Sequence, residues 1–133
     1  MIMDMNLTNN VIIGRQNIKK YKSNIGTVKT KNAIKESEKV ISSFEVKTPG
    51  TNTLATALSG GNQQKFVVGR ELEDDPGLLI ASQPTRGIDI GAQALIWDKL
   101  RESRDQGLAV LLISADLEAV SYTHLTLPTN VQV

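Results

Sequence analysis

In the second half of the chain, segments with the apolar spacing of a helix alternate with short continuous apolar runs typical of strands. A helix capped by Ser59 is predicted to run to about Leu72, and another spans Gly91–Gln106. Strands are predicted at Leu78–Ala81 and Leu108–Ile113, the latter with the uninterrupted apolar pattern of a strand covered on both faces. A last helix would begin over Ala115–Val120. This order predicts part of a parallel α/β sheet.

The first half is more polar and predominantly helical. Apolar positions predict a short helix over Asn6–Ile13 that ends at Gly14, and a longer one over Lys31–Phe44. Residues 15–30 have little periodicity and are expected to form a loop. Glu45–Lys47 should be short and extended, before a turn at residues 48–51.

Composition narrows the possible classes of protein. The 133 residues suffice for one domain with a core, and they contain no cysteine and a single histidine, which excludes disulfides, thiolate metal sites and histidine-rich sites. There is no apolar run of about 18 residues and no signal-peptide pattern at the start, which fits a cytosolic location.

Net charge is +1, but Arg15–Lys39 holds eight Lys or Arg residues. This segment is a solvated surface or, as a rival function, a contact for nucleic acid or anionic lipid. Tyr21 is the one aromatic residue among these charges, which argues against a stacking platform for single strands.

Three motifs follow one another at the centre of the chain. Residues 58–65 read Leu-Ser-Gly-Gly-Asn-Gln-Gln-Lys, the strand Leu78–Ala81 follows, and residues 84–89 read Pro-Thr-Arg-Gly-Ile-Asp. A Ser-Gly-Gly turn that opens a helix can clamp phosphate, because glycines admit an anion to backbone N–H groups and the helix dipole favours negative charge there. A bare Ser-Gly-Gly is also an ordinary helix N-cap.

In this order and spacing, the motifs resemble the signature motif, Walker B strand and D-loop of ATP-binding-cassette (ABC) ATPases. The wording is similar to the second ATPase half of bacterial importers for simple sugars or nucleosides. The resemblance implies a partial P-loop NTPase fold of class α/β, with a helical subdomain and part of a parallel sheet core. We expect residues 1–57 to belong to the helical subdomain and residues 58–120 to form the signature helix and an incomplete α/β core.

In this family, two cassettes close head to tail, so that the signature of one faces ATP held by the other. The resemblance therefore implies that Ser59, Gly60, Gly61 and Asn62 contact ATP in trans, and that Asp89 occupies the D-loop position. A turn-capping role for Asp89 is the alternative. Lys65 is either a partner for an anion or an exposed helix lysine.

At several positions this sequence lacks the functional group that the family carries there. Ser82 and Gln83 stand where Walker B carries the Asp that supports Mg²⁺ and the Glu that orients water, and Ala115 stands where the switch histidine is expected. No G-x-x-x-x-G-K-[ST] occurs. We therefore assign no catalytic residue and no metal ligand, and expect the chain alone neither to bind ATP tightly nor to hydrolyse it.

The resemblance implies a truncated piece of the ATP-hydrolysing subunit of a nucleoside or sugar importer. It would give its signature to a first cassette, which binds ATP and Mg²⁺, beside membrane permease subunits at the cytoplasmic face of the cell membrane. The alternative is a non-catalytic interaction or regulatory module that binds a partner cassette. We do not expect a nucleic-acid partner, and we expect the isolated chain to be poorly soluble because its sheet edges are unpaired.

Residues 121–133 depart from the family pattern. They resemble translated adaptor sequence, and we expect them not to be native protein; a disordered tail is the alternative. His124 lies in this tail and is given no role.

Overall fold

A computed structural model describes residues 1–115. In chain order, its elements are α1 (Leu7–Ile12), α2 (Thr30–Ser43), the short 3₁₀ helix η1 (Ala55–Ala57), α3 (Gly60–Leu72), β1 (Leu78–Ser82), α4 (Ile90–Asp105) and β2 (Ala109–Ile113). The helices and strands predicted up to Ile113 are thus confirmed. The helix predicted over Ala115–Val120, the tail and His124 lie outside the described residues, within which no helix is long and apolar enough to cross a membrane.

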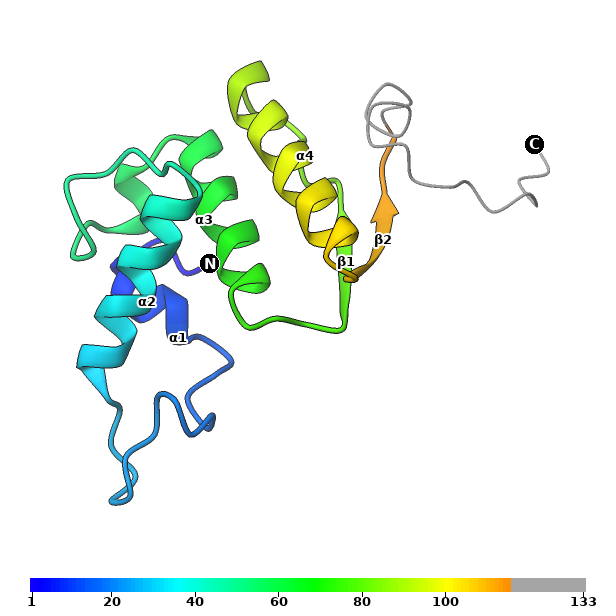
Figure 1. The fold of residues 1–133 in the computed structure, drawn as a ribbon. Helices are drawn as coiled ribbons and strands as arrows, with labels where there is room; N and C mark the ends of the chain where they lie inside the picture. The colour runs from blue at the N-terminus through cyan, green and yellow to red at the C-terminus, as the bar shows by residue number, and fades with distance from the viewer. Residues whose placement is uncertain (116–133) are drawn as a thin grey trace.

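The elements are stacked from one side of the molecule to the other (Figure 1). Helices α1 and α2 pack together, α3 packs on α2, α4 packs on α3, and the two strands lie beyond α4. One hydrophobic core runs through this stack, and its largest fully buried apolar side chains are Tyr21, Phe66, Leu7, Ile96, Val11 and Val40. Trp97 is also in the core. The division at residue 57 stays a prediction.

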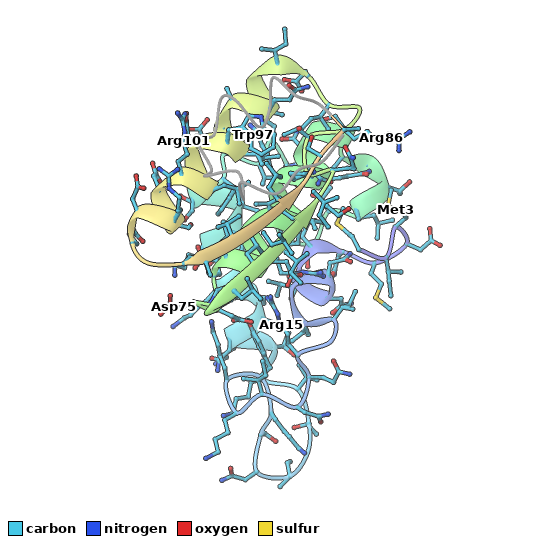
Figure 2. The ribbon with its side chains drawn as sticks, turned by 90° about the vertical axis from the view of Figure 1, so that its right-hand side faces the viewer. Met3, Arg15, Asp75, Arg86, Trp97 and Arg101 are labelled. Atoms are coloured by element: carbon cyan, nitrogen blue, oxygen red, sulfur yellow. The ribbon has the colours of Figure 1, made fainter. Side chains whose placement is uncertain are left out.

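The two strands pair in parallel, with Leu78 opposite Ala109 and Ser82 opposite Ile113. The prediction that Leu108–Ile113 is covered on both faces is wrong for the described residues. Alternate side chains are exposed instead, with relative accessibilities of 56% for Leu78, 60% for Ile80, 51% for Leu111 and 49% for Ile113. Only the other face, with Leu79 and Leu112, packs against the core, and Figure 2 shows the outer face of the strands in front of the helices.

Ion pairs attach the loop after α1 to the end of α3. Arg15 Nη2 lies 3.0 Å from Glu71 Oε2, and Arg15 Nε lies 2.9 Å from Asp74 Oδ2. Arg70 donates to Glu71 Oε1 and, over 2.9 Å, to the backbone oxygen of Asn10 near the end of α1. The two arginine side chains are only 11% and 12% exposed, so partnering offsets the cost of removing their charges from water.

The segment after α2 corrects a second prediction. Residues 45–47 were expected to be simply extended, but Glu45 has a φ of 50°, in the left-handed region that commonly ends helices. Its backbone N–H donates to Ser42 O, and Val46 N–H donates to Ile41 O. The chain therefore turns sharply before it passes the start of α3.

Helices α2 and α3 approach each other closely at Gly69. A Cβ atom placed on Gly69 would lie 2.6 Å from Cδ2 of Phe44 and 2.9 Å from Cγ1 of Val40. Both neighbours are buried, so neither side chain can turn out of the way without leaving a void. Glycine at this position sets the distance between the two helices.

We predict that Gly69→Ala destabilises the chain by about 1–3 kcal/mol, as overpacking of a filled core does. Alanine alone would favour the helix by up to about 1 kcal/mol, so a loss of stability would show that the clash dominates. Urea unfolding followed by circular dichroism measures the change. Gly77→Ala is the control, because its Cβ would meet nothing within 4 Å; equal midpoints for the two variants would contradict the prediction.

Candidate functional site

The predicted phosphate-clamping turn opens α3. Ser59 is the N-cap residue, with φ −63° and ψ 156°, and its Oγ accepts a hydrogen bond from Asn62 N–H at 3.4 Å. Ser59 and Gly60 are exposed, whereas Gly61 is buried. Hydroxyl and first-turn N–H groups at a helix N-terminus, where the dipole is positive, suit an anion.

The side chain of Asn62 is held at both ends of its amide group. Its Nδ2 donates to Ser59 Oγ over 2.9 Å, and its Oδ1 accepts from Lys47 N–H over 2.8 Å. The next side chain, Gln63, donates to the backbone oxygens of Ala55 and Leu58, each at 3.0 Å. The turn before α3 is therefore held by two neighbouring amide side chains.

The structure brings Asp89 next to the same turn. A Cβ atom on Gly61 would lie 2.8 Å from Asp89 Oδ2 and 3.1 Å from Cβ of Ala92. Asp89 is the N-cap of α4, and its Oδ1 accepts from Ala92 N–H over 2.9 Å. The capping role is thus confirmed, and the D-loop role stays a prediction. The Ala92 N–H hydrogen bond, with smaller help from Lys65, lowers the pKa of the Asp89 carboxyl.

The other predicted positions meet at the carboxyl ends of the strands. Gln83 follows β1 with a φ of 48°, and its N–H donates to Ile113 O, the last residue of β2, over 2.7 Å. Ser82 and Ala115 are exposed. None of these side chains carries a charge at neutral pH, and within residues 1–115 no three His, Cys, Asp or Glu residues gather as metal ligands would. Degeneracy of these positions stays a prediction.

Two contacts in this site, those of Lys47 and Gln63, were missed by the sequence analysis. Lys47 contributes only its backbone N–H, which no side-chain pattern reveals. Gln63 could have been noticed, because polar amides beside a helix N-cap often satisfy free backbone groups. Lys65 is half-buried and its Nζ lies 3.5 Å from Glu45 O, so it faces the end of α2. Arg86 is exposed at the rim of the molecule (Figure 2).

Curated proteins are similar to this chain in sequence. The chain is 42% identical over 120 residues to the guanosine import ATP-binding protein NupO of Bacillus subtilis, and 38% identical over 120 residues to the ribose import ATP-binding protein RbsA of Clostridium tetani. Each stretch is 90% of this chain and 23% of the relative. Identity to the galactose/methyl galactoside import ATP-binding protein MglA of Escherichia coli is 40% over 101 residues. The chain thus spans less than a quarter of these relatives, and no protein-family model matches it.

Solved structures share the fold. A dimeric structure of the bacterial ABC transporter cassette MJ0796 superposes with a TM-score of 0.71 at 23% identity, over 92% of this chain and 51% of the cassette. The structure of the same cassette in a post-hydrolysis state with ADP and Pi gives 0.68, over 90% and 50%. A putative metal-chelate type ABC transporter gives 0.70 at 17% identity. The predicted partial P-loop NTPase fold is thereby confirmed.

We predict that the stabilising effect of the Asp89 cap depends on pH. The pKa of Asp89 is lower in the folded than in the unfolded chain, so its contribution is complete above about pH 4 and is lost as the pH falls through the folded-state pKa. Asp89→Ala should therefore lower the urea midpoint at pH 7 and matter less at pH 3.

Asp89→Asn is the matched control, because asparagine also caps helices but does not titrate. The difference in urea midpoint between Asp89→Asn and Asp89→Ala should therefore be nearly the same at both pH values. An Asp89→Ala deficit as large at pH 3 as at pH 7 would contradict the assigned cap.

Proposed function

We propose that this chain, which is similar to ATP-binding subunits of bacterial ABC importers for sugars and nucleosides, supplies a signature motif to an ATP site held by another cassette. Ser59, Gly60 and Gly61 would face the γ-phosphate of that ATP. The observation that carries the proposal is the exposed helix N-terminus of α3. Ser59 and Gly60 are exposed, and a Cβ atom on Gly60 would meet nothing within 4 Å. The residue before this turn, Leu58, is held by a hydrogen bond from Gln63 to its backbone oxygen.

The ends of the strands support a role in trans rather than a complete site within this chain. Walker B chemistry needs one carboxylate for Mg²⁺ and a second for water. Ser82 and Gln83 offer neither. ATP and Mg²⁺ would therefore be held by the partner cassette, and this chain would contribute hydrogen-bond donors and the positive end of a helix dipole.

The wider setting follows from the relatives and is part of the proposal. Import ATP-binding proteins for guanosine, ribose and galactose are similar to this chain, so its substrate class would be a nucleoside or a simple sugar. We place it at the cytoplasmic face of the membrane, beside permease subunits and a first cassette. Asp89, packed on Gly61, would transmit movement between α4 and the signature turn.

A second candidate is a non-catalytic module that binds and regulates a partner cassette. The uncharged strand ends favour it, since they would leave the chain with recognition chemistry alone. A nucleic-acid partner is less well supported. Three residues of the basic segment, Arg15, Lys20 and Lys39, are in ion pairs with carboxylates from α2, the end of α3 and the turn that follows it, so less of its charge is available to a polyanion.

The sharpest test uses Gly60. A Cβ atom on Gly60 would meet nothing within 4 Å in this chain, so Gly60→Ala should not weaken the fold. It would, however, occupy the space through which a phosphate reaches the N–H groups. We expect the chain alone to show no ATP turnover, and to raise the turnover of a P-loop-bearing cassette from an importer of this family. Gly60→Ala should reduce that stimulation about 10-fold or more, the usual effect of losing a donor to developing charge.

Gly77→Ala, which also points into open space but far along the chain from the turn, is the control and should stimulate normally. ATP turnover by the isolated chain, or full stimulation by Gly60→Ala, would overturn the proposed role. Binding to the partner without any change in its turnover would favour the regulatory module.

A further inference from the structure

The hydrogen bonds around Ser59 determine what its hydroxyl can do. A serine hydroxyl has one donor proton and two acceptor lone pairs. Ser59 Oγ accepts from Asn62 N–H at 3.4 Å and from Asn62 Nδ2 at 2.9 Å. With both lone pairs engaged, the hydroxyl proton is the only hydrogen-bonding capacity left, and it can only donate.

The orientation of the Asn62 amide follows from its other partner. Lys47 N–H is a donor and cannot accept, so the atom that faces it at 2.8 Å must be the carbonyl oxygen Oδ1. If the amide were reversed, its NH₂ group would face the Lys47 N–H, and two donors would point at each other with no acceptor between them. The NH₂ group is therefore directed to Ser59, and the segment after α2 keeps it there.

We infer that Asn62 is a positioning residue which, anchored by the Lys47 N–H, turns the Ser59 hydroxyl into an obligatory donor for an anion. The inference rests on the proposed function for the identity of the anion, the γ-phosphate of ATP in the partner cassette. It changes the role expected for Asn62, whose amide is engaged within this chain and acts on the nucleotide through Ser59. The left-handed backbone of Glu45 turns the chain after α2 so that the Lys47 N–H reaches Asn62. The end of α2 therefore contributes to the proposed phosphate-binding turn.

The first measurement needs only the full chain and NMR. Lys47 N–H should exchange slowly with solvent in the wild type and faster in Asn62→Ala, and the side-chain NH₂ signals of Asn62 should move in Ser59→Ala. Thermal unfolding of each variant checks that it is folded. A Lys47 exchange rate that is the same in wild type and Asn62→Ala would overturn the inference, whatever the chain does to ATP.

The second measurement is a double-mutant cycle in the stimulation assay with the P-loop-bearing cassette and Mg-ATP. Asn62→Ala should raise the chain concentration that gives half-maximal stimulation by about 3- to 10-fold, the usual effect of one hydrogen bond. In a Ser59→Ala background, the same substitution should add less than about 2-fold, because it acts through the missing hydroxyl. Gln64→Ala, which removes an amide from the same helix, should change little.

The outcomes separate the inference from the proposed function. Additive losses for Ser59→Ala and Asn62→Ala would overturn the inference and show that Asn62 acts independently, while the proposed function stands. If the Lys47 exchange data hold but the wild-type chain stimulates no turnover, the proposed function fails and the donor role toward ATP fails with it.

Discussion

The close approach of α3 to its two neighbours is the constraint on which the rest of the structure depends. Gly69 lets Phe44 and Val40 lie against the backbone of α3 on one side, and Gly61 admits Asp89 and Ala92 on another. Interiors pack at nearly the density of crystals, so a methyl group at Gly69 would have to displace the buried Phe44 and Val40 side chains. At Gly61 it would meet the Asp89 carboxylate and Ala92. The same helix carries the core residue Phe66 and the exposed turn at Ser59 and Gly60, so the candidate site lies on an element that packs into the core.

Ion pairs add to apolar packing in connecting the first part of the chain to α3. The loop after α1 is held by the buried side chain of Tyr21 and also by Arg15, which pairs with Glu71 and Asp74 at and just after the end of α3. Arg70 reaches back to Asn10 and shares Glu71 with Arg15. Arg15 and Arg70 each have a partner distant in sequence, so the polar network links the first part of the chain to α3.

The candidate site has two parts: a hydrogen-bonded turn at the start of α3, and uncharged residues at the carboxyl ends of the strands. At the start of α3, every side chain from Ser59 to Gln63 that can form hydrogen bonds has a partner within the chain, which holds the turn in place. At the ends of β1 and β2, the corresponding positions are Ser82, Gln83 and Ala115. This asymmetry suits a chain that completes a site on another subunit, since recognition of phosphate needs oriented donors and dipoles, whereas hydrolysis also needs carboxylates and a metal.

The sequence by itself determined the features that arise from short-range physics. Apolar periodicity located the helices and strands, and the caps Ser59 and Asp89 each bond to the N–H group three residues later, so both were visible in the order of residues. Only the tertiary structure decided the contacts between distant segments. Lys47 donates to Asn62 through its backbone N–H, a group that every residue except proline has. The contact between Gly61 and Asp89 forms because the first turns of α3 and α4 lie next to each other. The outer face of β2 was misjudged for the same reason, because an apolar run shows what a strand can bury, while its coverage depends on which other elements lie against it.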